Sequence, residues 1–305
     1  MSKNVVIIGA GEIGLSLGRI LRTKDLAVRF WDKNSKTIEA LGGEEQGLPE
    51  IIPSAGVIFL CVPSWSVREA LIYITPYLNK QTILVAVSKG IEVGTLKTID
   101  QIISSQLPKS QPWALLSGMM LAEEIREGLF GGAVVASNKS STSQEIINLF
   151  SSTNLYLEKT NDLHGAALCG VLKNVYSLVL GISYGLNLGE NARGFLAVKS
   201  LTEMKKIISL LGGKQETVLG LAGLGDFIAT GLSNFSKNHQ AGIALTKNKI
   251  PPIQSEGLNS LSSLIILLGT KYKKFPLLCS LYEIVQGNLD TEEGFKKILY
   301  GTNRK

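Results

Sequence analysis

The chain has 305 residues, of which 45% are hydrophobic and 18% charged, a balance that excludes a disordered chain and allows two well-packed domains. Its net charge of +6 at pH 7 comes from scattered basic residues without a run of five, so a small anionic substrate is favoured over a nucleic-acid or membrane surface, although an ordinary basic surface is equally compatible. The longest apolar runs, near 175–182 and 261–268, are too short to cross a bilayer and no signal-peptide pattern is present, so we expect a soluble, cytoplasmic protein.

A glycine-rich turn is the first motif along the chain. Residues 4–8 form a short run typical of a buried strand, and Gly9, Gly11 and Gly14 follow in the spacing G-x-G-x-x-G before an apolar-periodic helix. In this context Gly9 makes a tight turn, Gly11 lets a pyrophosphate approach the backbone, and Gly14 lets the helix pack on the strand. Strand, turn and helix together predict a dinucleotide-binding site.

The second predicted strand bears on the choice of cofactor. Residues 26–31 are strand-like and lead to Asp32, whose carboxylate can accept both ribose hydroxyls of NAD and would repel a 2′-phosphate. Lys33 follows directly and weakens that argument. We therefore expect NAD, with NADP possible.

Strand-like runs then alternate with helical segments as far as residue 158. The run 57–62 ends at Pro63, and the run 82–87 leads to Lys89, which would lie at the carboxyl edge where α/β sheets bind ligands. A lysine there points towards the cofactor crevice, and a loop lysine in solvent is the alternative. The pattern is completed by strand-like runs at 113–116, 133–137 and 155–158 and by helical segments at 67–73 and 143–150. It predicts a doubly wound, parallel α/β sheet.

Beyond residue 158 the pattern becomes helical throughout. Helical periodicity covers 161–188, 192–211, 214–219, 227–245, 260–268 and 277–287. We therefore expect an α/β half with the dinucleotide-binding turn over residues 1–158. An all-α half is expected over residues 159–305.

The segment 161–188 is predicted to be one long buried helix with Lys173 and Asn174 in its middle. Asn161 or Asp162 can cap its start, and small residues at three- to four-residue spacing allow another backbone to approach closely. A lysine among apolar neighbours is rare unless it is paired, and burial moves the pKa of such a group towards the range of proton exchange near neutrality. The alternative is a lysine whose ammonium group reaches solvent along the helix.

A second polar cluster follows three glycines at 220–225. Asp226 is expected to cap the helix that begins there. Helical spacing places polar side chains on the same side, from Thr230 through Ser233 or Asn234 to Lys237. Such a row is most often a solvated helix face, and a cluster of chemically active side chains is the alternative.

The cysteines and histidines predict neither a disulfide nor a metal site. Cys61, Cys169 and Cys279 are odd in number, far apart and embedded in apolar sequence, which is typical of reduced thiols. His164 lies at a helix start without a visible partner, and His239 is expected to be a neighbour of the polar cluster. Neither histidine has cysteines or carboxylates at metal-ligand spacing, so no metal is expected.

Across nearly its whole length the chain resembles the NAD(P)-dependent glycerol-3-phosphate dehydrogenases, soluble enzymes that interconvert dihydroxyacetone phosphate and sn-glycerol 3-phosphate. The resemblance rests on several motifs in the family's order. They are Gly9-x-Gly11-x-x-Gly14, Val62-Pro63-Ser64, Ser88-Lys89-Gly90-Ile91-Glu92, Leu172-Lys173-Asn174-Val175, the segments 185–192 and 220–226, Ser236-Lys237-Asn238 and Glu256-Gly257. The family has an N-terminal Rossmann domain and a C-terminal helical domain, which agrees with the division above and implies a dinucleotide-binding domain over residues 1–158 and a substrate and catalytic domain over residues 159–305.

The resemblance also implies roles for individual residues. Lys173 would donate the proton to the carbonyl oxygen in reduction, Lys89 would hold that oxygen, and Asp226 would keep Lys173 protonated. The implied substrate contacts are Lys89, Gly118, Met120, Lys173, Asn174, Asp226, Thr230, Ser236, Lys237 and Asn238. The implied cofactor contacts are Gly9, Ala10, Gly11, Glu12, Ile13, Gly14, Asp32, Val62, Pro63, Lys89, Ala122, Lys237 and Glu256.

Three departures from the family pattern bear on the substrate. Gly118-Met119-Met120 stands where the family has Gly-Pro-Ser or Gly-Pro-Thr, and the region between Asp32 and Pro53 is shorter. Lys237 replaces a planar, bidentate arginine, and His239-Gln240 replaces a further basic pair.

Three hypotheses therefore remain. The first is an NAD-preferring dehydrogenase acting on dihydroxyacetone phosphate and glycerol 3-phosphate. The second is a related reductase of another small phosphorylated or carboxylated carbonyl compound, and the third is a non-catalytic NAD-binding protein. No nucleic-acid or membrane partner is expected, and a homodimer is the commonest closed assembly.

Overall fold

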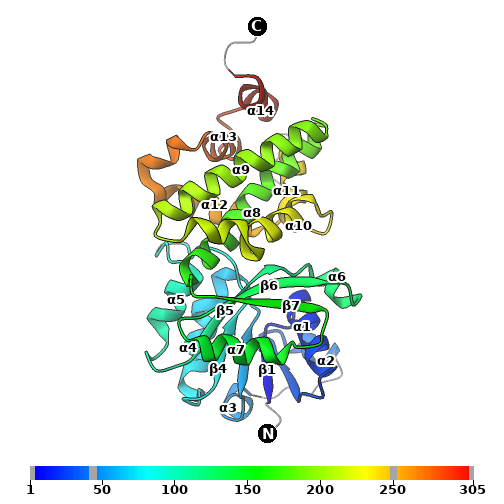
Figure 1. The fold of residues 1–305 in the computed structure, drawn as a ribbon, viewed down its shortest axis with the longest axis vertical. Coiled ribbons are helices and arrows are strands. Elements are labelled where there is room, and N and C mark those ends of the chain that lie inside the picture. Colours follow the sequence, from blue (N-terminus) through cyan, green and yellow to red (C-terminus); the bar gives the residue numbers. More distant parts are fainter. Residues whose placement is uncertain (1–3, 41–46, 248–252, 302–305) are drawn as a thin grey trace. The chain divides into compact units, whose positions relative to one another are not determined.

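The computed structural model describes residues 4–40, 47–247 and 253–301 of the chain. They form two compact units, one of residues 1–89 and 97–167 and the other of residues 90–96 and 168–305 (Figure 1). The change from one unit to the other falls inside helix α8 (Leu163–Gly185), after Ala167. The domain boundary at residue 158 stays a prediction.

The first unit is built on a seven-stranded sheet in the order β2-β1-β3-β4-β5-β6-β7. The strands are β1 (Val5–Ile8), β2 (Val28–Trp31), β3 (Val57–Leu60), β4 (Ile83–Ala86), β5 (Trp113–Met119), β6 (Gly131–Ala136) and β7 (Leu155–Thr160). Strands β1, β3 and β4 are runs of four apolar residues that are all buried, as expected where helices cover both faces of a parallel sheet. The predicted α/β, doubly wound fold is confirmed.

Strands β5 and β6 depart from the parallel arrangement. They pair antiparallel, with Gly118 opposite Ala133, whereas β6 and β7 pair parallel. The connection between β5 and β6 contains one short helix, α6 (Ala122–Arg126), and a parallel crossover usually needs a dozen or more residues. The short connection therefore turns the chain back beside β5.

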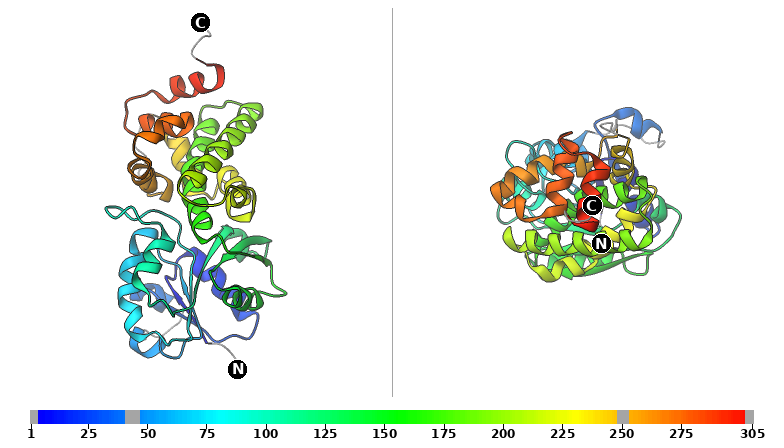
Figure 2. Two further views of the ribbon diagram at one scale, coloured as in Figure 1. Left: turned by 60° about the vertical axis from the view of Figure 1, so that its left-hand side comes forward. Right: turned by 90° about the horizontal axis from the view of Figure 1, so that it is seen from above.

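Helices cover the two faces of this sheet (Figure 2). On one face α1 (Glu12–Arg22) and α7 (Ser140–Leu149) contribute to the hydrophobic core. In this core the rings of Phe59 and Phe150 pack edge to face, with 5.8 Å between their centroids. Helices α4 (Val67–Ile74) and α5 (Ile99–Gln106) pack against each other on the other face. Two short helices, α2 (Ser35–Ala40) and α3 (Leu48–Ile51), complete the unit.

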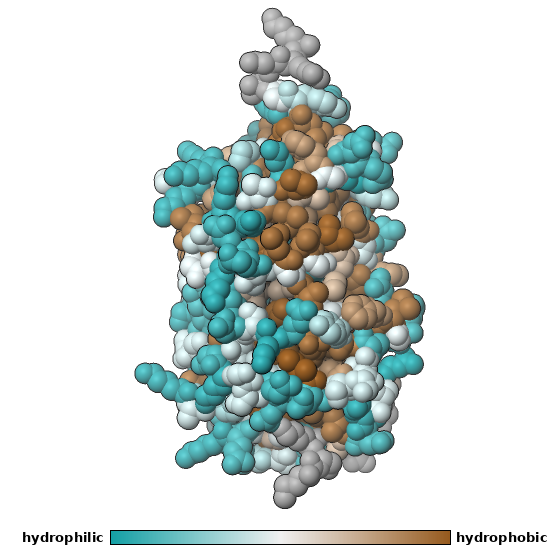
Figure 3. Space-filling model, in the orientation of Figure 1, coloured by the Kyte–Doolittle hydropathy of each residue, from teal (hydrophilic) through white to brown (hydrophobic). Residues whose placement is uncertain are grey.

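The described part of the second unit is helical. After α8 it contains α9 (Glu190–Leu210), α10 (Asp226–Leu232), α11 (Lys237–Leu245), α12 (Glu256–Leu268), α13 (Pro276–Val285) and α14 (Thr291–Tyr300). Short 3₁₀ segments lie at Gln215–Leu219 and Gly269–Lys274, and a π-helical turn lies at Leu221–Gly225. On the face seen in Figure 3, hydrophilic side chains are spread over both units between apolar areas, in line with the scattered charges of the sequence.

Helix α8 is the central helix of the second unit. Asp162 precedes it and accepts a hydrogen bond from the backbone N–H of Gly165 at 3.1 Å, as predicted for a cap. A Cβ on Gly181 would lie 2.1 Å from the carbonyl oxygen of His239, so this glycine lets α8 and α11 cross closely. The helix is long and apolar enough to span a membrane, contrary to the expectation from the apolar runs, but its most apolar window is 100% buried, as in the core helix of a soluble protein.

The sequence pattern misplaced several helical boundaries. The helix predicted over 227–245 is broken at 233–236, because Ser236 caps a new helix by accepting from the N–H of His239 at 3.2 Å. The segment predicted as a helix at 214–219 is a single 3₁₀ turn. Helix α14 was not predicted.

Candidate active site

The glycine turn after β1 has the geometry of a phosphate-binding loop. Gly9 has φ +96°, and a Cβ there would lie 2.8 Å from the carbonyl carbon of Cys61. A Cβ on Gly14 would lie 2.1 Å from the carbonyl oxygen of Gly9, whereas one on Gly11 would meet nothing within 4 Å. Helix α1 starts after Gly11, which makes no side-chain cap, so its first backbone N–H groups are not capped by the N-cap residue. The turn therefore fits a dinucleotide pyrophosphate.

Asp32 is tied to this turn by its carboxylate. Its Oδ2 atom accepts a hydrogen bond from the backbone N–H of Ala10 at 2.8 Å, and its Oδ1 atom accepts one from the N–H of Asn34 at 2.9 Å. The two bonds hold a negative charge beside the turn, where a ribose would lie if a dinucleotide occupies it.

Three other predicted cofactor contacts lie where α1 meets α6. Ser16 of α1 donates to the carbonyl oxygen of Ala122 at 2.8 Å, and Glu12 forms an ion pair with Arg126. Ile13 is partly buried against the core. Arg126 was not predicted as a partner of Glu12, since 114 residues separate them and no local pattern links them.

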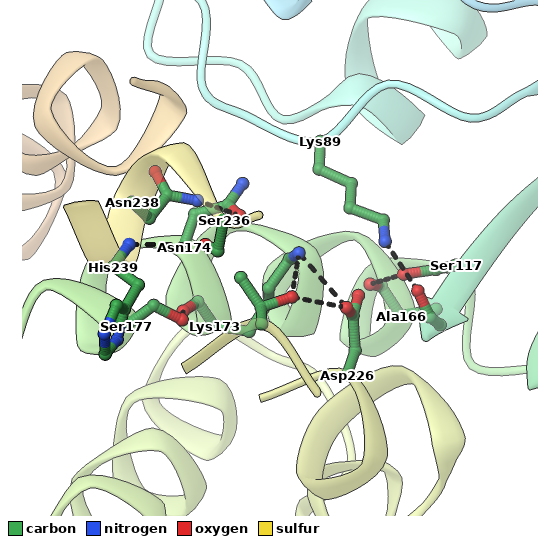
Figure 4. Close-up of polar contacts among 12 residues, drawn as sticks. Lys89, Ser117, Ala166, Lys173, Asn174, Ser177, Asp226, Ser236, Asn238 and His239 are labelled. Carbon is green, nitrogen blue, oxygen red and sulfur yellow. Dashed lines mark hydrogen bonds and ion pairs between the residues drawn. The ribbon is translucent and has the colours of Figure 1, made fainter. Parts of the chain in front are cut away.

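Lys89 lies just beyond the carboxyl end of β4, as predicted. Its Nζ donates to the carbonyl oxygen of Gly118 on β5 at 2.8 Å (Figure 4). The preceding Ser88 hydroxyl donates to the carbonyl oxygen of Val62. Pro63 follows Val62 and begins the turn into α4. The ends of β3, β4 and β5 are thereby linked at the edge where α/β sheets bind ligands.

In the second unit, Lys173 is held by Thr230 and Asp226 (Figure 4). Its Nζ donates to Thr230 Oγ1 at 2.8 Å and lies 3.1 Å from Asp226 Oδ1, and the Thr230 hydroxyl donates to that same carboxylate atom at 3.0 Å. The Lys173 side chain is 9% exposed and that of Asp226 2%, which excludes the alternative of an ammonium group in solvent. The arrangement orients a buried cation and a buried carboxylate around one hydroxyl.

A second hydrogen-bonded group starts from Asn174. Asn238 donates to the side-chain oxygen of Asn174 at 2.8 Å and accepts from the N–H of Gly257 at 2.9 Å. A Cβ on Gly257 would lie 2.4 Å from the carbonyl oxygen of Asn174, so the glycine permits this approach. Glu256, a predicted cofactor contact, is the first residue of α12 beside it. Residues from α8, α11 and α12 are thus fixed together.

The cluster around Asp226 differs from its prediction in two respects. The N-cap of α10 is Gly225 and Asp226 is the first helical residue, because a π-helical turn from Leu221 carries the chain into the helix. Thr230 lies one turn after Asp226 as expected, but the break at 233–236 ends the predicted row of polar side chains before Lys237.

Four other predicted substrate contacts lie outside these two hydrogen-bonded groups. Lys237 is exposed at the first position of α11, and Met120 packs partly buried against the core of the first unit. A Cβ on Gly118 would lie 2.4 Å from the carbonyl oxygen of Gly132, so the glycine there is required by the pairing of β5 with β6. Ser236, also a predicted contact, is buried and caps α11.

Both histidines have hydrogen-bond partners. No partner for His164 is visible in the sequence, and the structure places its Nδ1 2.9 Å from Asp100 Oδ2. His239 is fully buried and its Nδ1 lies 2.6 Å from the carbonyl oxygen of Gly231, so that nitrogen carries the proton and donates. Burial lowers the pKa of His239, which keeps the ring neutral.

Tyr176, one turn after Lys173, connects α8 to two other helices. Its hydroxyl donates to Glu203 of α9 at 2.7 Å, and the same carboxylate accepts from the N–H groups of Leu277 and Leu278 at the start of α13. Burial raises the pKa of Glu203, while these hydrogen bonds act in the opposite direction. The network anchors the part of α8 that carries Lys173.

The cysteines of the described residues are all free thiols, and burial raises the pKa of Cys61 to about 12. Cys169 is also buried, and Cys279 is partly exposed. Within the described ranges no group of three or more histidine, cysteine, aspartate or glutamate side chains could hold a metal ion.

Comparisons with known proteins point to one family. The chain matches the family models for the NAD-dependent glycerol-3-phosphate dehydrogenase N-terminus over residues 44–143 and C-terminus over residues 162–296. It is 31% identical to glycerol-3-phosphate dehydrogenase [NAD(P)+] of Coxiella burnetii, covering 97% of this chain and 96% of that one. It is 33% identical to the enzyme of the same name from Synechocystis, over 97% of this chain and 92% of that one.

A solved structure agrees with these sequence relatives. The crystal structure of glycerol-3-phosphate dehydrogenase from Coxiella burnetii superposes with a TM-score of 0.87 at 28% identity, over 98% of this chain and 99% of that chain. Ketopantoate reductase from Ralstonia eutropha matches with a TM-score of 0.60 at 18% identity and shares the fold alone.

Proposed function

Because the chain belongs to the NAD-dependent glycerol-3-phosphate dehydrogenase family, we propose that it reduces dihydroxyacetone phosphate to sn-glycerol 3-phosphate, reversibly, as an NAD(P)-dependent oxidoreductase. The observation that supports this most strongly is the buried group of Lys173, Thr230 and Asp226, because reduction of a ketone needs a proton donor. The relatives are named for the same substrate.

The glycine turn and Asp32 would hold the cofactor. The backbone N–H groups at the start of α1, which the N-cap residue leaves uncapped, suit a pyrophosphate, and the carboxylate of Asp32 suits ribose hydroxyls. When bound, the nicotinamide supplies the hydride that goes to the ketone carbon. The residues that we assign to the cofactor are those of the turn (9–14) together with Asp32, Val62, Pro63, Lys89, Ala122, Lys237 and Glu256.

Lys173 would complete the reduction by giving one proton to the carbonyl oxygen. As the ketone carbon gains a hydride, its oxygen gains negative charge and accepts the proton from Nζ; in the reverse direction Nζ takes that proton back. Asp226 stabilises the ammonium form, and Thr230 fixes the direction of the Cε–Nζ bond. A buried proton donor with a fixed direction is worth about 10²–10⁴ in rate.

Lys89 would stabilise the same oxygen electrostatically. The carbonyl oxygen of Gly118 orients its ammonium group, so little reorganisation is needed as charge develops. We assign the substrate's hydroxyl and phosphate contacts to Asn174, Ser236, Lys237 and Asn238, with Gly118 and Met120 as neighbours. A lysine at 237 binds phosphate as a point charge, which demands less geometry than an arginine fork.

The test is the oxidation of NADH by the wild-type protein with a panel of small carbonyl compounds at equal concentration. We expect dihydroxyacetone phosphate to give the highest kcat/KM. A clear preference for another phosphorylated or carboxylated ketone would support the second hypothesis instead. NADH binding without turnover of any compound would identify a non-catalytic binding protein.

Two features of the whole protein are also proposed. The cofactor-binding part corresponds to residues 1–158 and the substrate part to residues 159–305, with Lys89 contributed by the first. We propose a cytoplasmic homodimer, since twofold assemblies are the commonest among soluble oligomers and the isolated thiols suit a reducing compartment.

A further inference from the structure

Lys33, the residue that made the cofactor preference ambiguous in the sequence, is engaged in an ion pair in the structure. Its Nζ lies 2.8 Å from Oε1 of Glu69, and the side chains are 78% and 47% exposed. Glu69 belongs to the first turn of α4, and 36 residues separate it from Lys33. The proximity of Glu69 raises the pKa of Lys33, so the lysine is a cation throughout the neutral range.

The ion pair lies at the edge of the sheet that carries the glycine turn. Strands β2 and β3 pair with β1 on its two sides, and all three run parallel. Lys33 follows the carboxyl end of β2, and Glu69 lies on the helix that follows β3. The pair therefore joins the connections after β2 and β3 across the carboxyl end of β1, where the turn begins. The adenosine half of a dinucleotide is bound at this edge in such sheets.

Charge decides between the two nicotinamide cofactors at this position. They differ by a 2′-phosphate on the adenosine ribose, which a nearby acid repels and a nearby cation accommodates. Asp32 supplies the acid, and its hydrogen bonds from Ala10 and Asn34 prevent it from turning away. Lys33 is the adjacent cation, so its availability determines whether the phosphate can be neutralised.

We propose that the Lys33–Glu69 ion pair makes this protein select NADH over NADPH, with Glu69 as the specificity-determining residue that withholds Lys33 from a 2′-phosphate. The inference rests on the proposed use of a nicotinamide cofactor. With the pair formed, Glu69 holds the ammonium group of Lys33, and a 2′-phosphate would meet the Asp32 carboxylate without that ammonium group to neutralise it.

The exposure of both side chains limits the size of the effect. Exposed ion pairs are screened by water and salt, so the pair shifts the cofactor preference without setting it alone. We expect Glu69→Gln to improve the Kd and kcat/KM for NADPH about two- to fivefold relative to those for NADH. The gain should shrink at high ionic strength, because it is electrostatic.

The experiment is a double-mutant cycle read by cofactor binding. Dissociation constants of NADH and NADPH are measured by fluorescence titration for wild type, Glu69→Gln, Lys33→Met and the double variant, and kcat/KM is measured in parallel with dihydroxyacetone phosphate. The expected result is a gain for NADPH in Glu69→Gln that disappears when Lys33 is also replaced. Glu292→Gln is the matched control, since Glu292 forms an exposed pair with Lys296 on α14 at 2.6 Å.

Two results would overturn the proposal. One is a Glu69→Gln variant whose ratio of NADPH to NADH affinity equals that of wild type or of Glu292→Gln. The other is a gain of the same size in the Lys33→Met background, which would mean that Glu69 acts without Lys33. Because binding is measured without substrate, either result is distinct from a failure of the proposed dehydrogenase activity.

Discussion

Replacing Thr230 by valine tests whether the hydroxyl between Lys173 and Asp226 orients the proton donor. The substitution keeps the branched shape and removes a group that accepts from Lys173 at 2.8 Å and donates to Asp226 at 3.0 Å. Thr230 is 4% exposed, so water is poorly placed to substitute for the lost hydroxyl. A hydrogen bond to a charged group contributes about 1.5–3 kcal/mol, and each 1.36 kcal/mol is tenfold in rate. We therefore expect kcat to fall about ten- to 150-fold.

The assay is steady-state oxidation of NADH with saturating dihydroxyacetone phosphate, together with the KM for NADH. The KM for NADH should change little, because Thr230 lies outside the assigned cofactor contacts. Thr230→Ser keeps the hydroxyl and should retain most of the activity. Thr202→Val is a second control, since Thr202 donates to the carbonyl oxygen of Val198 at 2.8 Å on the exposed side of α9. Wild-type kcat in Thr230→Val, or an equal loss in Thr230→Ser, would refute the reasoning.

Two further predictions concern stability. Gly181→Ala should lower the free energy of unfolding by about 3 kcal/mol or more, because its Cβ would lie 2.1 Å from the carbonyl oxygen of His239 and packed backbone must move. Gly194→Ala is the control, because a Cβ there meets nothing within 4 Å, and it should be neutral or stabilising by up to about 1 kcal/mol. If the two variants changed the free energy of unfolding in urea equally, the result would contradict the packing of α8 on α11. Burial lowers the pKa of His239 from its usual 6.5, so on acidification the unfolded chain takes up a proton before the folded protein does. The contribution of the neutral ring to the free energy of unfolding is therefore complete above pH 6.5 and is lost as the pH falls below it. His239→Asn should flatten the stability profile below that pH, and an unchanged slope would show that the ring is not the group responsible.

The features that could be predicted from the sequence are those that depend on neighbouring residues. The apolar runs of β1, β3 and β4 and the glycine spacing after β1 each specify a local conformation, and the structure confirms both. The apolar residues around Lys173 within one helix favour burial, with an ammonium group that reaches solvent as the alternative, and the structure shows the side chain buried. Asp226 and Thr230 are one helical turn apart, so their contact also follows from local spacing.

The features that could not be predicted depend on partners distant in the chain or on competing local signals. Glu69 pairs with Lys33 and Asp100 with His164 across 36 and 64 residues, and only the fold brings them together. The break before α11 arises where apolar spacing favours one continuous helix and the Ser236 cap favours a new one. The antiparallel direction of β6 beside β5 depends on the length of the connection between the two strands, and the strand pattern alone does not determine that direction.

The most direct test of the proposed chemistry is the Lys173→Met variant, which retains the length of the side chain and removes its proton. NADH oxidation with dihydroxyacetone phosphate is measured beside NADH binding by fluorescence, with Lys199→Met on the exposed side of α9 as the control. We predict a fall in kcat of about 10²–10⁴ with NADH affinity within a few fold of wild type. A Lys173→Met variant that binds NADH and turns over at the rate of Lys199→Met would contradict the assignment of Lys173 as the proton donor.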